Sequence, residues 1–130
     1  MEPNQSEIAF EFLPIIRVYE VTVCFSNILN HRTGVSSKDV TIASESNLTA
    51  RLYLPKLTKE NQKLSLLVYF HGGAFCVSSP FNSKYHSYLN TLGAEANVVA
   101  VSVNYRKAPE HPLPAAYDDA WVALQWVVSH

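Results

Sequence analysis

The sequence predicts an α/β fold in which antiparallel strands lead into a strand–helix–strand unit. Residues 49–54 alternate between apolar and polar side chains, which is typical of a half-buried strand. Residues 64–70 and 98–103 are almost continuously apolar, as in parallel strands that helices cover on both faces. Between these two runs, residues 83–96 repeat their apolar side chains at the spacing of a helix.

Weaker signals mark the elements that come before this unit. Residues 8–12 alternate weakly, and residues 15–25 are compatible with one or two strands, with no clear hairpin turn between them. Thr33-Gly34 predicts a turn, and residues 39–42 alternate again. Pro55 ends the half-buried strand, since proline cannot donate to a ladder of hydrogen bonds.

A second helix is predicted to begin near Ala116. Asp118 and Asp119 suit its first turn, where carboxylates favour the positive end of the helix dipole. Its apolar stripe consists of Tyr117, Ala120, Trp121, Leu124 and Val128. The chain ends at His130 while this pattern is still intact, so we expect a truncated domain.

Composition excludes several classes of partner. The formal net charge is -1 and basic residues form no cluster, which argues against nucleic acid and anionic membrane surfaces. Apolar runs fall far short of the ~20 residues of a membrane span. The polar, acidic N-terminus has no signal-peptide pattern, which predicts a cytoplasmic location. Cys24 and Cys76 have neither metal-ligand spacing nor a disulfide framework, so we expect no metal and no cofactor.

Two of the 4 glycines, Gly72 and Gly73, stand side by side directly after the first buried strand. In open α/β sheets, ligands bind beyond the carboxyl ends of the strands. Three interpretations are open: a tight turn, a phosphate-binding loop, and an oxyanion hole built from backbone N–H groups. The spacing lacks both glycine-rich phosphate motifs, which disfavours the second interpretation.

A longer pattern accompanies the glycine pair. The sequence HGGAF at residues 71–75 is followed by YRKAPEHPLPAAYDDAW at residues 105–121. Together they resemble the plant carboxylesterases of the hormone-sensitive-lipase branch of the α/β-hydrolases. The resemblance covers residues 31–130 and extends to residues 33–40 and 50–55. It implies the N-terminal part of an α/β-hydrolase fold, present in incomplete form.

The resemblance also implies roles for individual residues. It places Gly72, Gly73 and Ala74 at the oxyanion hole, through their backbone N–H groups. His71 resembles the residue that shapes this loop, and it is not assigned as a general base. Mainly structural roles, in capping and local ion pairs, are expected for Arg106, Glu110, Asp118 and Asp119.

The catalytic triad of a serine hydrolase has no match in the sequence. No two glycines flank a serine in the G-x-S-x-G spacing of a nucleophile elbow. His31, His86, His111 and His130 cannot be assigned as the base, so we assign no catalytic nucleophile, base or acid. The expected division is a cap-like segment at residues 1–30 and a hydrolase portion at residues 31–130, truncated before the elbow. The Lys-Asp-Gly turn usual in the family is missing after residues 12–19.

The resemblance therefore implies the N-terminal portion of a serine carboxylesterase, with a small-molecule ester as the substrate. Without the triad, the chain is expected to be inactive as given. One alternative is a non-enzymatic protein that binds a small molecule, as in the gibberellin-receptor branch of the family. Another is a fragment without any function of its own. The sequence does not determine the oligomeric state.

Overall fold

A computed structural model describes residues 8–12, 16–19, 28–60 and 62–130. Strands β1 (Ile8–Phe12) and β2 (Ile16–Tyr19) form an antiparallel pair, within the region that the sequence marks only weakly. Of the strand predicted within residues 15–25, residue 15 and residues 20–25 lie outside the described residues.

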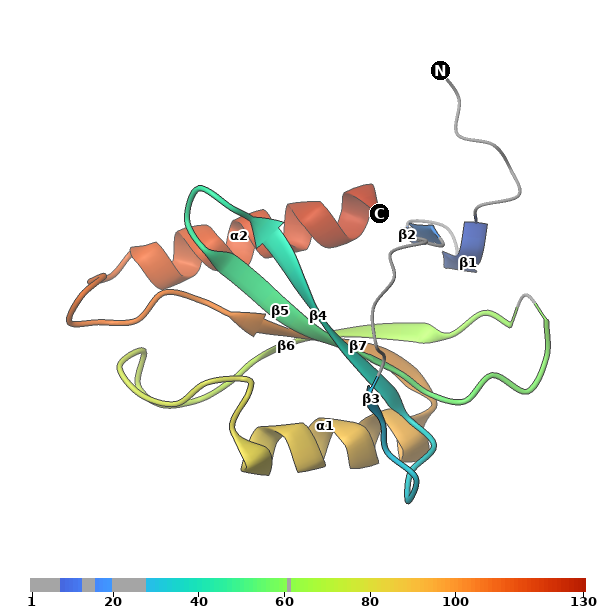
Figure 1. Cartoon of the computed structure of the whole chain (residues 1–130). Helices are drawn as coiled ribbons and strands as arrows, with labels where there is room; N and C mark the ends of the chain where they lie inside the picture. Colours follow the sequence, from blue (N-terminus) through green and yellow to red (C-terminus); the bar gives the residue numbers. More distant parts are fainter. Residues whose placement is uncertain (1–7, 13–15, 20–27, 61) are drawn as a thin grey trace.

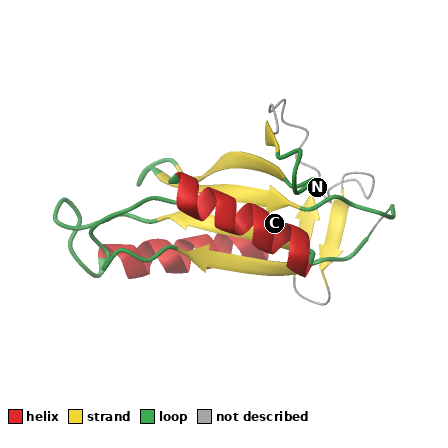
Figure 2. Ribbon diagram, turned by 90° about the horizontal axis from the view of Figure 1, so that it is seen from below, coloured by secondary structure: helices red, strands yellow, loops and turns green. Residues whose placement is uncertain are grey.

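The main body of the molecule is a mixed five-stranded sheet between two helices. The strand order is β3-β4-β5-β7-β6, with β6 parallel to β7 and the other neighbours antiparallel. The bounds are β3 Ile28–Leu29, β4 Ser36–Ala43, β5 Leu48–Leu54, β6 Ser65–Phe70, α1 Ser83–Ala96, β7 Val98–Asn104 and α2 Ala115–Ser129. Helix α1 covers one face of the sheet and α2 covers the other (Figures 1 and 2). The predicted α/β fold, with antiparallel strands before a β6-α1-β7 unit, is confirmed.

Each face of the sheet packs its own small core. On the side of α2, the buried cluster consists of Leu48, Ala50, Val101, Val103, Ala123 and Val127. On the side of α1, it consists of Val35, Tyr53, Leu89 and Ala100. Successive residues of β5 and β7 divide between the two clusters because side chains alternate across a strand. The two helices are therefore held by the same central strands.

The strand register places four polar residues in one row across the sheet. Asp39 on β4 pairs with Arg51 on β5, Arg51 pairs with Ser102 on β7, and Ser102 pairs with Tyr69 on β6. Directly paired residues project from the same face of a sheet. Tyr53 lies two residues after Arg51 and belongs to the α1 cluster, so this row faces α1.

Strand β6 is less buried than its apolar sequence predicts. Burial on both faces was expected for residues 64–70, but the side chains from Leu66 to Tyr69 are half-buried and Phe70 is exposed. The reason is topological, because among the described strands β6 forms an edge of the sheet and has a neighbour on one side only. Strand β7 lies one position further in, and its residues from Ala100 to Val103 are buried as predicted.

Helix α2 presents its small side chains to the sheet. Its buried residues are Ala116, Asp119, Ala123 and Val127. The predicted apolar stripe lies mostly outward, with side chains exposed by 58% at Tyr117, 63% at Trp121 and 55% at Val128. An apolar stripe normally faces the core. Here the opposite face is buried, with Ala123 and Val127 in the core cluster and Asp119 paired with Arg106. Among the described residues, neither helix is long and apolar enough to cross a membrane.

Candidate functional site

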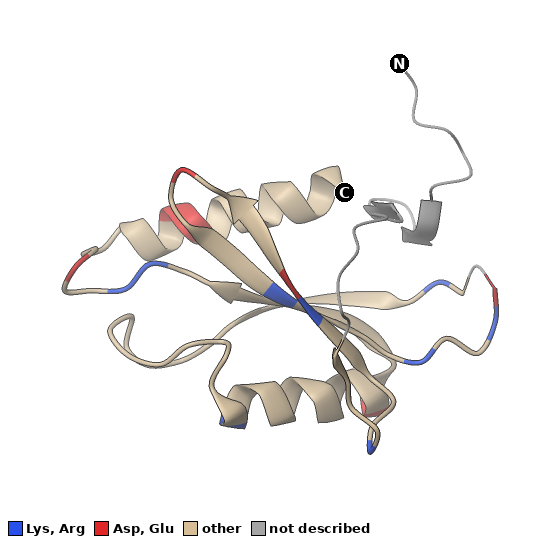
Figure 3. Cartoon of the chain, viewed as in Figure 1, with Lys and Arg blue, Asp and Glu red and all other residues tan. Residues whose placement is uncertain are grey.

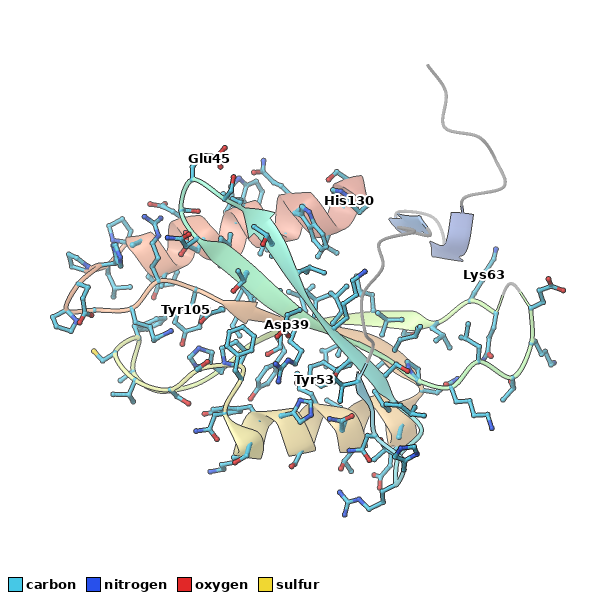
Figure 4. All side chains as sticks on the ribbon, viewed as in Figure 1. Asp39, Glu45, Tyr53, Lys63, Tyr105 and His130 are labelled. Carbon is cyan, nitrogen blue, oxygen red and sulfur yellow. The ribbon has the colours of Figure 1, made fainter. Side chains whose placement is uncertain are left out.

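Two loops meet at the carboxyl ends of the parallel strands. The loop after β6 runs from His71 to Asn82, and the loop after β7 runs from Tyr105 to Pro114. Both lie at the left in Figure 1, and Figure 4 labels Tyr105 at this end. The backbone N–H of Ala108 donates to the carbonyl oxygen of Phe75 at 2.9 Å, which ties the loops together. This is the edge of the sheet at which α/β proteins bind ligands.

His71 is buried at the start of the first loop, and its contacts hold the loop against Tyr105. Its side chain is 2% exposed, and its ring stacks on Tyr105 with 4.5 Å between the ring centroids. The hydroxyl of Tyr105 donates to the carbonyl oxygen of His71 at 2.5 Å. The His71 Nδ1 lies 2.8 Å from the carbonyl oxygen of Gly72, and since a carbonyl only accepts, Nδ1 carries the proton. These contacts agree with the loop-shaping role that the resemblance implies.

The surroundings of His71 disfavour the charged form of its ring. Burial lowers its pKa, the hydrogen bond to Gly72 opposes this shift, and the charge of Lys107 lowers the pKa further. Among the described residues, the buried Nε2 atom has no hydrogen-bond partner. His71 thus has no described contact with a nucleophile, which is consistent with leaving it out of the catalytic assignments.

The structure requires glycine at position 73 but not at position 72. Gly73 has a φ of 131°, and a Cβ there would stand 2.2 Å from the carbonyl oxygen of Val77. The Gly73 carbonyl oxygen accepts from the backbone N–H groups of Cys76 and Val77, at 3.0 and 3.1 Å. A Cβ on Gly72 would meet only the hydroxyl of Tyr85, at an ordinary 3.7 Å. The tight turn therefore explains Gly73 and leaves Gly72 unexplained.

The backbone N–H groups at the start of the loop have no acceptor among the described residues. Within the described residues, no hydrogen bond uses the N–H of Gly72, Gly73 or Ala74 as a donor. Ala74 and Phe75 both adopt left-handed conformations, with φ of 52° and 60°. Gly72 and Ala74 are exposed, so solvent and ligands reach this stretch. Successive backbone N–H groups in such turns form concavities that bind anions.

The second loop is anchored by a buried carboxylate. Asp119 on α2 is 2% exposed, and its Oδ2 accepts from the backbone N–H of Arg106 at 2.8 Å. The Arg106 Nη2 donates to Oδ1 at 2.8 Å, and Nε contacts both oxygens. The hydrogen bonds to Asp119 raise the pKa of Arg106. The structural roles expected of these two residues are thus visible, whereas Glu110 and Asp118 are exposed.

No nucleophile–base pair stands beside the loop in the described part of the chain. The His130 Nδ1 lies 3.0 Å from the Ser129 hydroxyl, but both belong to the end of α2 and both contact the carbonyl oxygen of Trp126. Cys76 is exposed, and Cys24 lies outside the described residues. The described residues contain no group of three side chains suited to a metal ion.

Sequence reasoning missed one polar cluster beneath α1. Arg51 forms a bidentate ion pair with Asp39 and also contacts His86. The signal that could have found it is the pair of opposite charges in two alternating strands that flank one short turn. A hairpin register pairs such residues on the same face.

The fold agrees with that of known proteins. Residues 67–130 match the model of a family described as alpha/beta hydrolase fold. A 2-hydroxyisoflavanone dehydratase of Glycine max is 48% identical over 95% of this chain and 42% of its own length. Probable carboxylesterase 5 of Arabidopsis thaliana is 48% identical over 97% of this chain and 43% of its own length.

A solved esterase structure is also similar to this chain. An esterase of Pyrobaculum calidifontis superposes with a TM-score of 0.60 at 36% identity, over 78% of this chain and 30% of that one. The chain spans about two fifths of the length of these curated relatives (42% and 43%). On these matches, the chain belongs to the α/β-hydrolase fold family, with plant carboxylesterases and 2-hydroxyisoflavanone dehydratases among its relatives.

Proposed function

We propose that Gly72, Gly73 and Ala74 supply the oxyanion hole of a serine carboxylesterase. The observation that carries this proposal is the run of backbone N–H groups that have no acceptor within the described part of the chain, at the carboxyl ends of the parallel strands. Ester hydrolysis builds negative charge on the carbonyl oxygen, and fixed N–H donors aimed at that oxygen lower the barrier. The phosphate alternative has no support beyond the donors themselves, because the loop lacks both phosphate-binding motifs.

Residues 31–130 would then act as the N-terminal part of the hydrolase domain, before the nucleophile elbow, with residues 1–30 as a cap-like segment. The proposed substrates are carboxylic esters of small molecules, a class that rests on the names of the esterase relatives. The few charged side chains are scattered over the described chain (Figure 3), which suits an uncharged ligand. The cytoplasmic location stays a prediction from the sequence, and cell fractionation tests it.

The dehydratase relatives support a second candidate, the elimination of water from a hydroxylated carbonyl compound. Removing a proton beside a carbonyl group also places negative charge on the carbonyl oxygen. The same N–H donors would stabilise that charge. The two candidates therefore share the loop and differ in the groups that act on the substrate.

A chimera tests the proposal. Residues 28–130 of this chain replace the matching segment of the Arabidopsis relative probable carboxylesterase 5, and kcat and KM are measured with p-nitrophenyl acetate. Gly73→Val should lower kcat by roughly 10²-fold or more, because a branched side chain displaces the donors. Gly93→Ala in α1 is the control, because its Cβ would meet neighbours only at ordinary distances of 3.6 to 3.9 Å. An unchanged kcat in a folded Gly73→Val chimera would refute the proposal.

A further inference from the structure

Arg51 joins three segments that are far apart in the sequence. Its Nε and Nη2 atoms donate to the two carboxylate oxygens of Asp39, at 2.6 and 2.8 Å. Its guanidinium carbon lies 4.9 Å from the ring centroid of Phe81, the residue before the N-cap of α1. Its Nη1 atom lies 3.3 Å from the Nδ1 atom of His86, in the first turn of α1. The Arg51 side chain is only 16% exposed.

The register of the sheet explains the orientation of the Arg51 side chain. Arg51 is the cross-strand partner of Asp39, so the carboxylate orients the guanidinium plane. The bidentate arrangement leaves the face of the guanidinium for the Phe81 ring and leaves Nη1 for His86. Figure 4 labels Asp39 and Tyr53 on neighbouring strands, on the side of the sheet that α1 covers.

The far end of the glycine loop is held by the buried side chain of Pro80 and by the contact of Phe81 with Arg51. Near its start, the loop is tied by Phe75 to Ala108 and by the turn that closes on Gly73. Near its end, the bonds of the Phe81 and Asn82 backbone N–H groups to Ser79 are local and do not reach the sheet. Arg51 contacts Phe81 and the first turn of α1, and the first turn is also contacted by Tyr53 through His86 and by Tyr69 through Tyr85.

We propose that Arg51, oriented by Asp39, is a positioning residue that fixes the far end of the loop of residues 71–82 and so holds the N–H groups of Gly72, Gly73 and Ala74 in place. We call the contacts of Arg51 with Asp39, Phe81 and His86 the clamp, and they are observed independently of the proposed function. The effect of the clamp on turnover rests on the proposed function. A loop held at both ends keeps its donors fixed without reorganisation, which is the condition for effective oxyanion stabilisation.

The clamp requires a neutral His86. Arg51 can only donate, so the Nδ1 atom of His86 must accept. The groups that face the ring are Arg51 and Tyr53 from β5, Asp39 from β4 beyond Arg51, and Asn90 from α1. Burial lowers the pKa of His86, the Arg51 charge lowers it further, and Asp39 opposes both. Acid should therefore loosen the end of the loop by placing a second cation against Arg51.

Hydrogen exchange of the whole 130-residue chain tests the clamp. Exchange is followed by mass spectrometry in peptides covering residues 72–82 and 98–104, and the exchange of the His86 ring C2 hydrogen reports its pKa. In Arg51→Gln, backbone exchange in residues 72–82 should rise about tenfold while that in residues 98–104 stays unchanged. The pKa of His86 should rise because the neighbouring cation is gone. Arg32→Lys, at an exposed turn, is the control and should change neither reading.

Phe81→Leu gives a second test, because it removes the ring and leaves the Asp39–Arg51 pair in place. It should speed backbone hydrogen exchange in residues 72–82 and change the pKa of His86 only slightly. Unchanged loop exchange in both variants would overturn the proposal, and so would a rise that is equal in both peptides. In the chimera, Arg51→Gln should lower kcat with little change in KM. Faster loop exchange with an unchanged kcat would leave the clamp standing and refute the oxyanion role.

Discussion

The carbonyl oxygen of Val77 occupies the space that a Cβ on Gly73 would need, at 2.2 Å from the ideal Cβ position. Gly73 in turn accepts two backbone hydrogen bonds, from Cys76 and Val77. Val77 therefore closes the turn through its N–H group and excludes a side chain from Gly73 through its carbonyl oxygen. This leaves glycine as the residue that fits there.

The two glycines should respond differently to the same substitution. Gly73→Ala should cost about 1–3 kcal/mol, because the backbone must move and φ is positive. Gly72→Ala should stay within about 0.5 kcal/mol, because its Cβ would have an ordinary contact. Urea denaturation with limited proteolysis of the loop measures both. Equal effects would mean that the turn relaxes more easily than its contacts indicate.

Removing the Asp119 carboxylate should loosen the second loop and helix α2 together. Asp119→Ala should cost about 1–3 kcal/mol, because a buried acceptor is lost and the Arg106 backbone N–H loses its partner. Asp118→Ala is the matched control on the exposed side of the same turn, and it should cost about 0.5 kcal/mol through the helix dipole. Thermal unfolding compares them, and a similar shift in both variants would contradict the anchoring role.

Stability should fall in mild acid because of two histidines. The pKa values of His71 and His86 both lie below the ordinary 6.5 in the folded chain, so the unfolded chain binds protons first as the pH falls. Their contribution is complete above pH 6.5 and is lost as the pH drops through the lowered folded values. Urea midpoints at pH 7.5, 6.5 and 5.5 measure this trend. His86→Gln should flatten it, and an unchanged trend in this variant would contradict the prediction.

The isolated chain should associate. Strand β6 has an open side, and no charged residue or proline interrupts Ser65–Phe70. Such edges template pairing between chains. The exposed side chains of Tyr117, Trp121 and Val128 on α2 add apolar surface that favours contact between chains. Size-exclusion chromatography should show species larger than a monomer, and Ser65→Lys should reduce them. A monodisperse monomer with a sharp unfolding transition would refute this prediction.

The chain on its own should not turn over an activated ester. Its 130 residues contain no G-x-S-x-G motif, and donors for an oxyanion have no serine to assist. Incubation with p-nitrophenyl acetate decides this, with heat-denatured chain as the control for background hydrolysis. Saturable hydrolysis well above the control would show that another nucleophile of the chain acts with the loop.

The sequence by itself determined the local elements and the place of the loop. Helix α1 spans the predicted residues 83–96, and the glycine pair stands at the end of a strand, as expected. These features depend on periodicity and on glycine, which act through neighbouring residues. The motifs also carried the resemblance to carboxylesterases, because long patterns such as residues 105–121 are specific without any structure.

The tertiary structure alone decided what depends on distant residues. The sequence could not show that β6 takes the edge, since strand order follows from the packing of the whole sheet. Nor could it show that α2 turns Trp121 outward, because the packing of Ala123 and Val127 in the core depends on strands that are distant in the sequence. The contact of Arg51 with Phe81 depends on the register of the strands and on the position of α1. Such contacts join residues whose spacing carries no local signal, so only the folded chain brings them together.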